Sequence, residues 1–134
     1  MDPQPAALLV LAHGGGWESR FQVTSLAASA VAAGQRVDVA LFFAALDAWV
    51  GERWDAPEPA ATVSPERLAG LDLPPLTSML APGRADGRLR LLACSASTRI
   101  LGLSTADVQA KVDAIVGWPT FQRLVRTAGS VVTL

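Results

Sequence analysis

The sequence predicts an α/β fold, a three-layer α/β/α sandwich around a mainly parallel sheet of five strands. Short apolar runs of strand length alternate along the chain with stretches in which apolar residues recur at helical spacing. Several of these runs, such as residues 6–12, are apolar throughout, which is typical of strands buried on both faces of a parallel sheet. Successive parallel strands are joined by right-handed crossovers through helices, so we expect helices on both faces.

The composition fits a single domain, residues 1–134. The 11 basic and 12 acidic side chains nearly cancel, and the single lysine, Lys111, leaves no basic run, so we expect no nucleic-acid partner. The most extended apolar tract, residues 26–49, is interrupted by Arg36 and Asp38. It therefore falls short of the roughly 20 uninterrupted apolar residues of a membrane span, and we expect no membrane partner.

The cysteine content and residues 1–5 indicate in which cellular compartment the protein is expected. One cysteine, Cys94, cannot form an intrachain disulfide. Residues 1–5 lack the positive charge that begins a secretory signal. We therefore expect a cytoplasmic protein.

The first half of the chain is expected to supply two strands and two helices. Val23, Leu26 and Ala30 share one helical face, and Gly34 stands where a left-handed C-terminal cap is expected. The expected elements are a strand at 6–12, a helix from Glu18 to Gly34, a strand at 36–43 and a short helix over 46–50.

The middle of the chain is less regular. Residues 52–63 hold two prolines and scattered charge without a clear period, which predicts a surface loop. Ser64 followed by Pro65 favours the start of a short helix, with serine at the cap and proline in the first turn. A second helical piece over 76–81 is expected to end at the following Pro-Gly pair.

Three strands and three helices are expected in the remainder. Ser104 with Asp107 three residues later resembles a capping box, and Pro119 suits a first helical turn. The expected elements are a strand at 89–94, a short helix to Gly102, a helix from Ser104 through Lys111, a strand at 112–116, a helix from Pro119 to Ala128 and a strand at 130–134.

The candidate site centres on Cys94, which ends an apolar strand where a helix begins. Ser95 and Ser97 are placed to cap that helix. The unbonded N–H groups and the dipole at a helix start favour negative charge, so a cysteine there is favoured as thiolate. The alternative is a buried cysteine that acts as a small hydrophobe. We expect the thiol to be at least partly accessible.

A second group of candidate residues follows the first strand. His13 and the loop Gly14-Gly15-Gly16 are expected at the sheet edge that also carries Cys94, because the carboxyl ends of parallel strands meet there. The imidazole of His13 can hold a proton or steady a thiolate, or it merely ends the strand. The glycine loop and Ser95 are candidates for binding a small anion. Arg99 either pairs with that anion or is a solvated helix residue.

Several other chemistries are disfavoured. The loop after His13 is similar to the oxyanion loop of esterases, but the chain has no Gly-x-Ser-x-Gly elbow. One histidine and one cysteine do not supply a conventional zinc set, so we expect no metal and no cofactor. The glycine run also lacks the spacing and the lysine of the common phosphate loops. The four tryptophans, each shortly after an expected strand, indicate a pocket or a subunit contact, or they fill the core.

Several features recur together along the chain: an apolar first strand with a glycine loop, an alanine-rich helix that closes on Gly34, and a strand at 37–43. They are followed by the segment 92–97, which runs to Gly102, and by the tail 117–132. With these features the chain as a whole resembles the DsrE/DsrF-like family of small sulfur-relay proteins.

This resemblance implies a three-layer fold, a homotrimer or homohexamer, and a cysteine that carries persulfide sulfur between a donor and an acceptor protein. That role transfers only to Cys94. Two alternatives stay open: a non-catalytic assembly subunit of the same fold, and a protein that binds a small anion or nucleotide at the glycine loop.

Overall fold

The structure, a computed structural model, describes residues 5–134 and holds one five-stranded sheet in the order β4-β3-β2-β1-β5. Every strand pair in it is parallel, as the sequence predicts. The elements are β1 (Leu8–Ala12), α1 (Trp17–Ala32), β2 (Val37–Leu41), α2 (Phe43–Val50), α3 (Pro65–Ala69), α4 (Leu76–Ala85), β3 (Leu89–Cys94), α5 (Ser95–Ile100), α6 (Thr105–Gln109), β4 (Ala114–Val116), α7 (Trp118–Thr127) and β5 (Ser130–Thr133).

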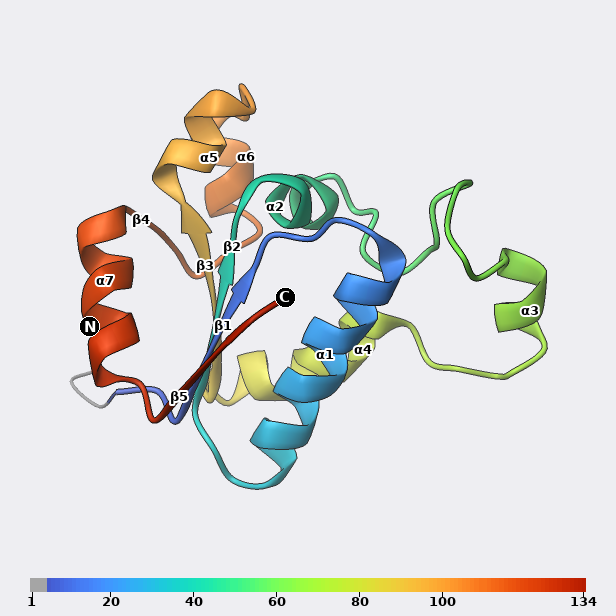
Figure 1. Ribbon diagram of the computed structural model, residues 1–134, viewed down its shortest axis with the longest axis horizontal. Helices are drawn as coiled ribbons and strands as arrows, with labels where there is room; N and C mark the ends of the chain where they lie inside the picture. Colours follow the sequence, from blue (N-terminus) through green and yellow to red (C-terminus); the bar gives the residue numbers. More distant parts are fainter. Residues whose placement is uncertain (1–4) are drawn as a thin grey trace.

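The helices form two layers and a rim around the sheet (Figure 1). Helices α1 and α4 pack side by side on one face, and α7 lies on the other. Helices α2, α5 and α6 gather beyond the carboxyl ends of the strands, and α3 stands out from the body on a long excursion. The three-layer α/β/α architecture predicted from the sequence is therefore confirmed.

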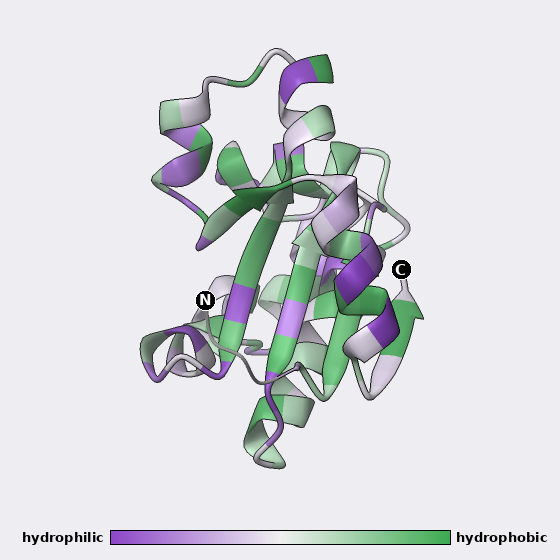
Figure 2. Cartoon of the chain, turned by 90° about the vertical axis from the view of Figure 1, so that its left-hand side faces the viewer, coloured by the Kyte–Doolittle hydropathy of each residue, from purple (hydrophilic) through white to green (hydrophobic). Residues whose placement is uncertain are grey.

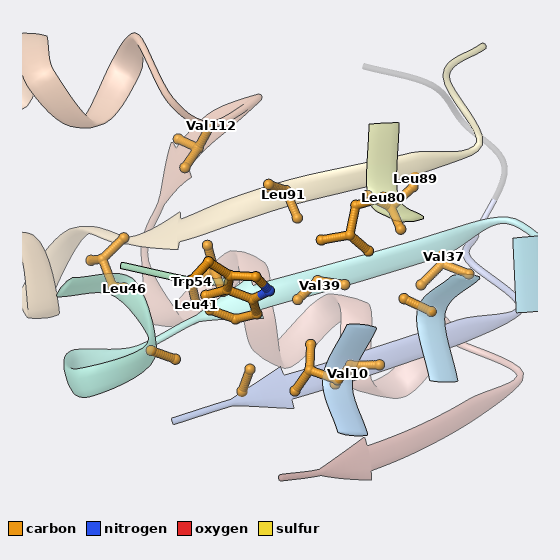
Figure 3. Close-up of a cluster of buried hydrophobic side chains, with 14 of the residues drawn as sticks. Val10, Val37, Val39, Leu41, Leu46, Trp54, Leu80, Leu89, Leu91 and Val112 are labelled. Atoms are coloured by element: carbon orange, nitrogen blue, oxygen red, sulfur yellow. The ribbon is translucent and has the colours of Figure 1, made fainter. Parts of the chain in front are cut away.

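The larger part of the core lies between the sheet and the α1–α4 layer. Valine and leucine side chains from β1, β2 and β3, with Leu46 of α2 and Leu80 of α4, form one cluster with the buried indole of Trp54 (Figure 3). The indole Nε1 donates a hydrogen bond of 2.9 Å to Oγ1 of Thr24 on α1. Burial stabilises the fold by about 1.5–3 kcal/mol for each fully buried valine or leucine. Because Trp54 lies in residues 52–63, its buried indole also holds this irregular segment after α2 against the body of the protein.

The face under α7 has a smaller core and a buried ion pair. Phe121 of α7 packs against Leu9, Phe42 and Leu92. Below them, Arg90 of β3 donates from Nε to Oδ1 of Asp38 on β2 at 2.8 Å and from Nη2 to Oδ2 at 2.9 Å. Figure 2, which views the sheet from the α7 side, shows hydrophilic bands within otherwise hydrophobic strands.

Most predicted boundaries agree with the structure. Ser64 Oγ accepts from Arg67 N at 3.2 Å, and Ser104 Oγ accepts from Asp107 N at the same distance, so both predicted serine caps are confirmed. Gly34 has φ +86, as a glycine cap requires. Residues 52–63 contain neither helix nor strand.

Two predicted boundaries are wrong. Helix α4 does not end at the Pro-Gly pair but continues through it to Ala85, because Gly83 lets the helix approach the core closely: a Cβ on it would lie 3.1 Å from side-chain atoms of Leu89 and Val31. Strand β2 ends at Leu41, and Phe43 already belongs to α2 with φ +42, a left-handed conformation that turns the chain directly from strand into helix.

Across residues 5–134, no helix combines the length and apolar character that a membrane span requires.

Candidate functional site

The carboxyl edge of the sheet carries the candidate residues. Cys94 is the last residue of β3, His13 follows β1, and the strained Phe43 follows β2. In an open parallel sheet this edge is where ligands bind. The structure therefore brings the predicted residues to one edge, and their separate contacts decide what each can do there.

The thiol of Cys94 caps the helix that follows it. Cys94 is the N-cap of α5, in extended conformation, and its Sγ accepts the backbone N–H of Ser97 at 3.4 Å. The expectation that Ser95 and Ser97 cap this helix is therefore wrong, because the strand continues as far as Cys94 and puts the thiol itself at the cap position. Within the described chain, Oγ of Ser97 is buried and has no hydrogen-bond partner.

The thiol is also buried. Cys94 is 1% exposed and belongs to the cluster that contains Phe42 and Phe121. The indole of Trp118 stacks on Phe42 with ring centroids 5.3 Å apart and contacts Phe121 at 5.7 Å, while remaining half exposed itself. We call Phe42, Trp118 and Phe121 the aromatic cluster. The expectation of a partly accessible thiol is wrong here, because β2 and α7 bring these rings to the tip of β3.

His13 does not join the thiol. Its side chain is exposed, and its backbone N–H donates to the carbonyl oxygen of Leu134 at 2.9 Å. Strand β2 lies between β1 and β3, so the ends of the latter two are about 10 Å apart, two strand spacings. Among residues 5–134 no hydrogen bond joins the imidazole to Sγ of Cys94, which accepts the backbone N–H of Ser97 instead.

The glycine loop fits tightly between two helices. A Cβ on Gly15 would lie 2.6 Å from Cβ of Ala44 at the start of α2, and one on Gly14 would lie 2.6 Å from Oγ of Ser19. Gly16 is the N-cap of α1 and has no side chain to satisfy the first N–H groups of the helix. The loop thus delivers an uncapped helix N-terminus to the carboxyl edge.

That N-terminus holds a carboxylate of the chain itself. The backbone N–H of Trp17 donates to both carboxylate oxygens of Glu58, at 3.2 and 3.1 Å, and Nη2 of Arg20 donates to Oε2 at 2.9 Å. Hydrogen bonds from the backbone N–H of Glu58 itself and of Trp17, with the charge of Arg20, lower the pKa of Glu58 below its ordinary value despite partial desolvation.

Reasoning from the sequence missed both Glu58 and Arg20. A usable signal existed for Arg20, since it lies on the same helical face as the buried Trp17, Val23 and Thr24, where a charged side chain needs a partner. No local pattern singles out Glu58, because its partner Trp17 lies 41 positions earlier in the chain.

The remaining predicted binding residues lie around α5. Ser95 is half-buried and lies beside Gly117, since a Cβ placed on Gly117 would lie 3.6 Å from Ser95 Oγ. Arg99 is exposed and lines an open hollow of about 350 Å³ with Ala96 and Ile100. Neither residue lines the hollow of about 650 Å³ that adjoins the glycine loop, so the predicted anion-binding set is divided between two places.

The tryptophans fill the core more than they line the edge. Trp17 and Trp54 are buried, and Trp49 packs edge-on against Trp54 and donates from Nε1 to the carbonyl of Lys111 at 2.8 Å. Only Trp118 among them exposes much of its ring, 53% of the residue. It is the tryptophan that remains available for a partner.

Comparison of the sequence with protein-family models finds no match, and comparison with curated proteins finds none either.

Proposed function

We propose that the chain is a sulfur-relay protein that accepts sulfane sulfur on Cys94 and passes it on. The observation that carries this proposal is the hydrogen bond from the Ser97 backbone N–H to Cys94 Sγ at the junction of strand and helix. This contact holds Sγ at the carboxyl edge of the sheet, where open α/β sheets bind ligands, and a cysteine sulfur placed there is the nucleophile that sulfur exchange requires. The resemblance to DsrE/DsrF-like proteins supports the same assignment.

The chemistry is a pair of exchanges at sulfur. The Cys94 thiolate attacks the outer sulfur of a donor persulfide, so that a new S–S bond forms on Sγ while the donor's S–S bond breaks and the donor leaves as thiolate. The proton stays on the transferred sulfur. An acceptor thiolate then attacks that outer sulfur and releases Cys94 as thiolate. The two steps involve no net oxidation, and one cysteine suffices.

We infer that the thiol becomes accessible when the aromatic cluster opens, because Phe42 and Phe121 pack in one cluster with Cys94. Trp118 is its outermost ring and stands at the first position of α7, directly after Gly117. Phe43 and Ile100, 45% and 71% exposed, are further apolar side chains on the helices beyond the carboxyl edge. We infer that a donor protein docks on Trp118 and its neighbours and exposes Sγ as it binds, in a cytoplasm that keeps the thiol reduced.

The second candidate is an assembly subunit in which Cys94 only packs. The observation in its favour is the 1% exposure of Cys94 among apolar neighbours, since free cysteine commonly behaves as a small hydrophobe. The two candidates differ in one property, the reactivity of the folded thiol.

Alkylation by iodoacetamide, followed by intact mass, distinguishes them. We expect slow labelling of the native protein through opening of the aromatic cluster, faster labelling in Trp118→Ala by about tenfold, which corresponds to about 1.4 kcal/mol, and none in Cys94→Ser. His13→Ala and Val125→Ala, on the same helix as Trp118 but outside the cluster, serve as controls with unchanged rates. Labelling that proceeds only as fast as global unfolding, and equally in Trp118→Ala, would select the assembly subunit.

A further inference from the structure

The internal contact between Glu58 and α1 has the composition of an oxyanion site. One backbone N–H at the start of a 16-residue helix and one guanidinium converge on two carboxylate oxygens. Helix N-termini bind phosphate, sulfate and carboxylate groups by this combination of N–H donors and positive dipole. Glu58 is thus positioned as an external anion would be.

Arg20 is built into this site and is not a surface charge that happens to be near. Its side chain is 3% exposed. It donates from Nη1 to the carbonyl of Arg53 and from Nη2 to the carbonyl of Ala56, at 3.0 Å, as well as to Glu58. Its Nε is buried and, among the residues that the structure describes, has no hydrogen-bond partner. The Glu58 carboxylate compensates this buried guanidinium, so a ligand that displaced Glu58 would have to bring a negative charge of its own.

Glu58 reaches the helix from an irregular segment of the chain and stays in contact with solvent. It lies in the excursion 52–63, which has no helix or strand, and its side chain is 42% exposed. The hollow of about 650 Å³ in front of the helix has Gly15, Gly16, Arg20 and Glu58 itself in its lining, with Arg53 and the acidic Asp47 and Glu52 further along its wall. Withdrawal of this one side chain would extend the hollow to the helix N–H groups.

We propose that the start of α1, with Arg20, is a binding site for a phosphate-type oxyanion, and that Glu58 is a built-in competitor that occupies it in the absence of ligand. The anion takes the place of the Glu58 carboxylate on the Trp17 N–H and the Arg20 guanidinium, and the excursion moves outward. The site is separate from the thiol of Cys94, so it stands or falls independently of sulfur transfer.

The test is a titration of the ¹⁵N-labelled full chain with inorganic phosphate at constant ionic strength, following the backbone amide of Trp17. Glu58→Ala should show a saturable shift of this amide, with half-saturation at least about ten times below that of the wild type, because the tethered carboxylate no longer competes. Glu58→Gln gives the same comparison with less loss of side chain. Glu66→Ala, an exposed glutamate on α3, is the matched control and should behave as wild type.

Adenosine monophosphate in place of inorganic phosphate identifies the source of the oxyanion. Tighter binding indicates a nucleotide, and equal binding indicates the free oxyanion; both support the site. Two results would overturn the proposal: no shift of the Trp17 amide up to about 20 mM phosphate in either Glu58 variant, or equal half-saturation in wild type and variants. Glu58 would then only cap the helix, with the stabilising effect of an ordinary N-cap residue.

Discussion

Asp38 and Arg90 form a buried ion pair with two matched hydrogen bonds. Asp38 is 3% exposed at its side chain and Arg90 is 21% exposed. A pair of this kind contributes modest net stability while intact, because both charges lose water, but loss of one partner leaves the other charge buried without compensation. The two residues are partners in the register of β2 against β3.

Arg90→Leu should therefore lower the free energy of unfolding by about 3–5 kcal/mol, measured by urea denaturation at neutral pH. Arg88→Leu is the control, since Arg88 is exposed and its contact with Asp86 is long, 3.8 Å; it should cost less than about 1 kcal/mol. If both substitutions cost the same small amount, the buried carboxylate is compensated by other means.

For single residues, the sequence predicted where a residue lies in the fold better than it predicted the burial and contacts of the side chain. Cys94 stands at the strand tip as expected, because an apolar run followed by serines signals a strand that gives way to a helix. Its burial was not predictable, since it depends on Phe42 and Phe121, which are distant in sequence and reach Cys94 only once β2 and α7 are in place.

Among the elements, the glycine loop and α2 depend on each other. Gly15 leaves no room for a side chain beside Ala44. A Cβ on Gly16, by contrast, would meet only the Glu58 carboxylate, at 3.4 Å, and the Gly16 backbone is ordinary extended chain. Glycine is therefore required at position 15, where a side chain does not fit, whereas neither space nor backbone dihedral angles require glycine at position 16.

Gly15→Ala should destabilise the protein by about 1–3 kcal/mol, through displacement of the loop or of α2. Gly16→Ala should cost less, at most about 1 kcal/mol, because a Cβ fits there and restricts the unfolded chain, which offsets part of the lower preference for alanine at a helix N-cap. Thermal denaturation of the two variants measures the difference. Equal effects would show that the loop does not pack against α2 as described.

The elements were predictable where local signals dominate and not where packing overrides them. Serine caps, glycine ends and apolar runs located most of the helices and all of the strands. Helix α4 passed its Pro-Gly pair because contact of Gly83 with Leu89 and Val31 outweighs the lost hydrogen bond of proline. The left-handed conformation of Phe43 was not predictable either, since no local sequence signal favours that conformation for phenylalanine.

For the whole molecule, the fold class followed from the alternation of strands and helices, but the strand order did not. Periodicity along the chain does not state which strands are neighbours, and α7 carries the chain from the β4 edge to the opposite edge at β5. The prediction of the candidate site was the part most affected by the unknown strand order. Residues that share the carboxyl edge, such as His13 and Cys94, are separated by the strand between them.

We propose that the chain assembles as a homotrimer, or as a hexamer of two trimers. The physical motive is the apolar surface left on a small domain outside the donor surface: Leu71 and Leu73 are exposed, and so is Val131 on the edge strand β5. Light scattering coupled to size exclusion should give a mass about three or six times that of the 14.0 kDa chain. A monomer at micromolar concentration would refute the assembly.

Loading of Cys94 from a persulfidated donor protein at low stoichiometry, followed by intact mass spectrometry, tests the relay most directly. We expect a product heavier by one sulfur atom that dithiothreitol reverses, that forms faster in Trp118→Ala and that is absent in Cys94→Ser. The contradicting result is an unloaded Cys94 with every candidate donor under conditions in which iodoacetamide alkylates the same folded thiol.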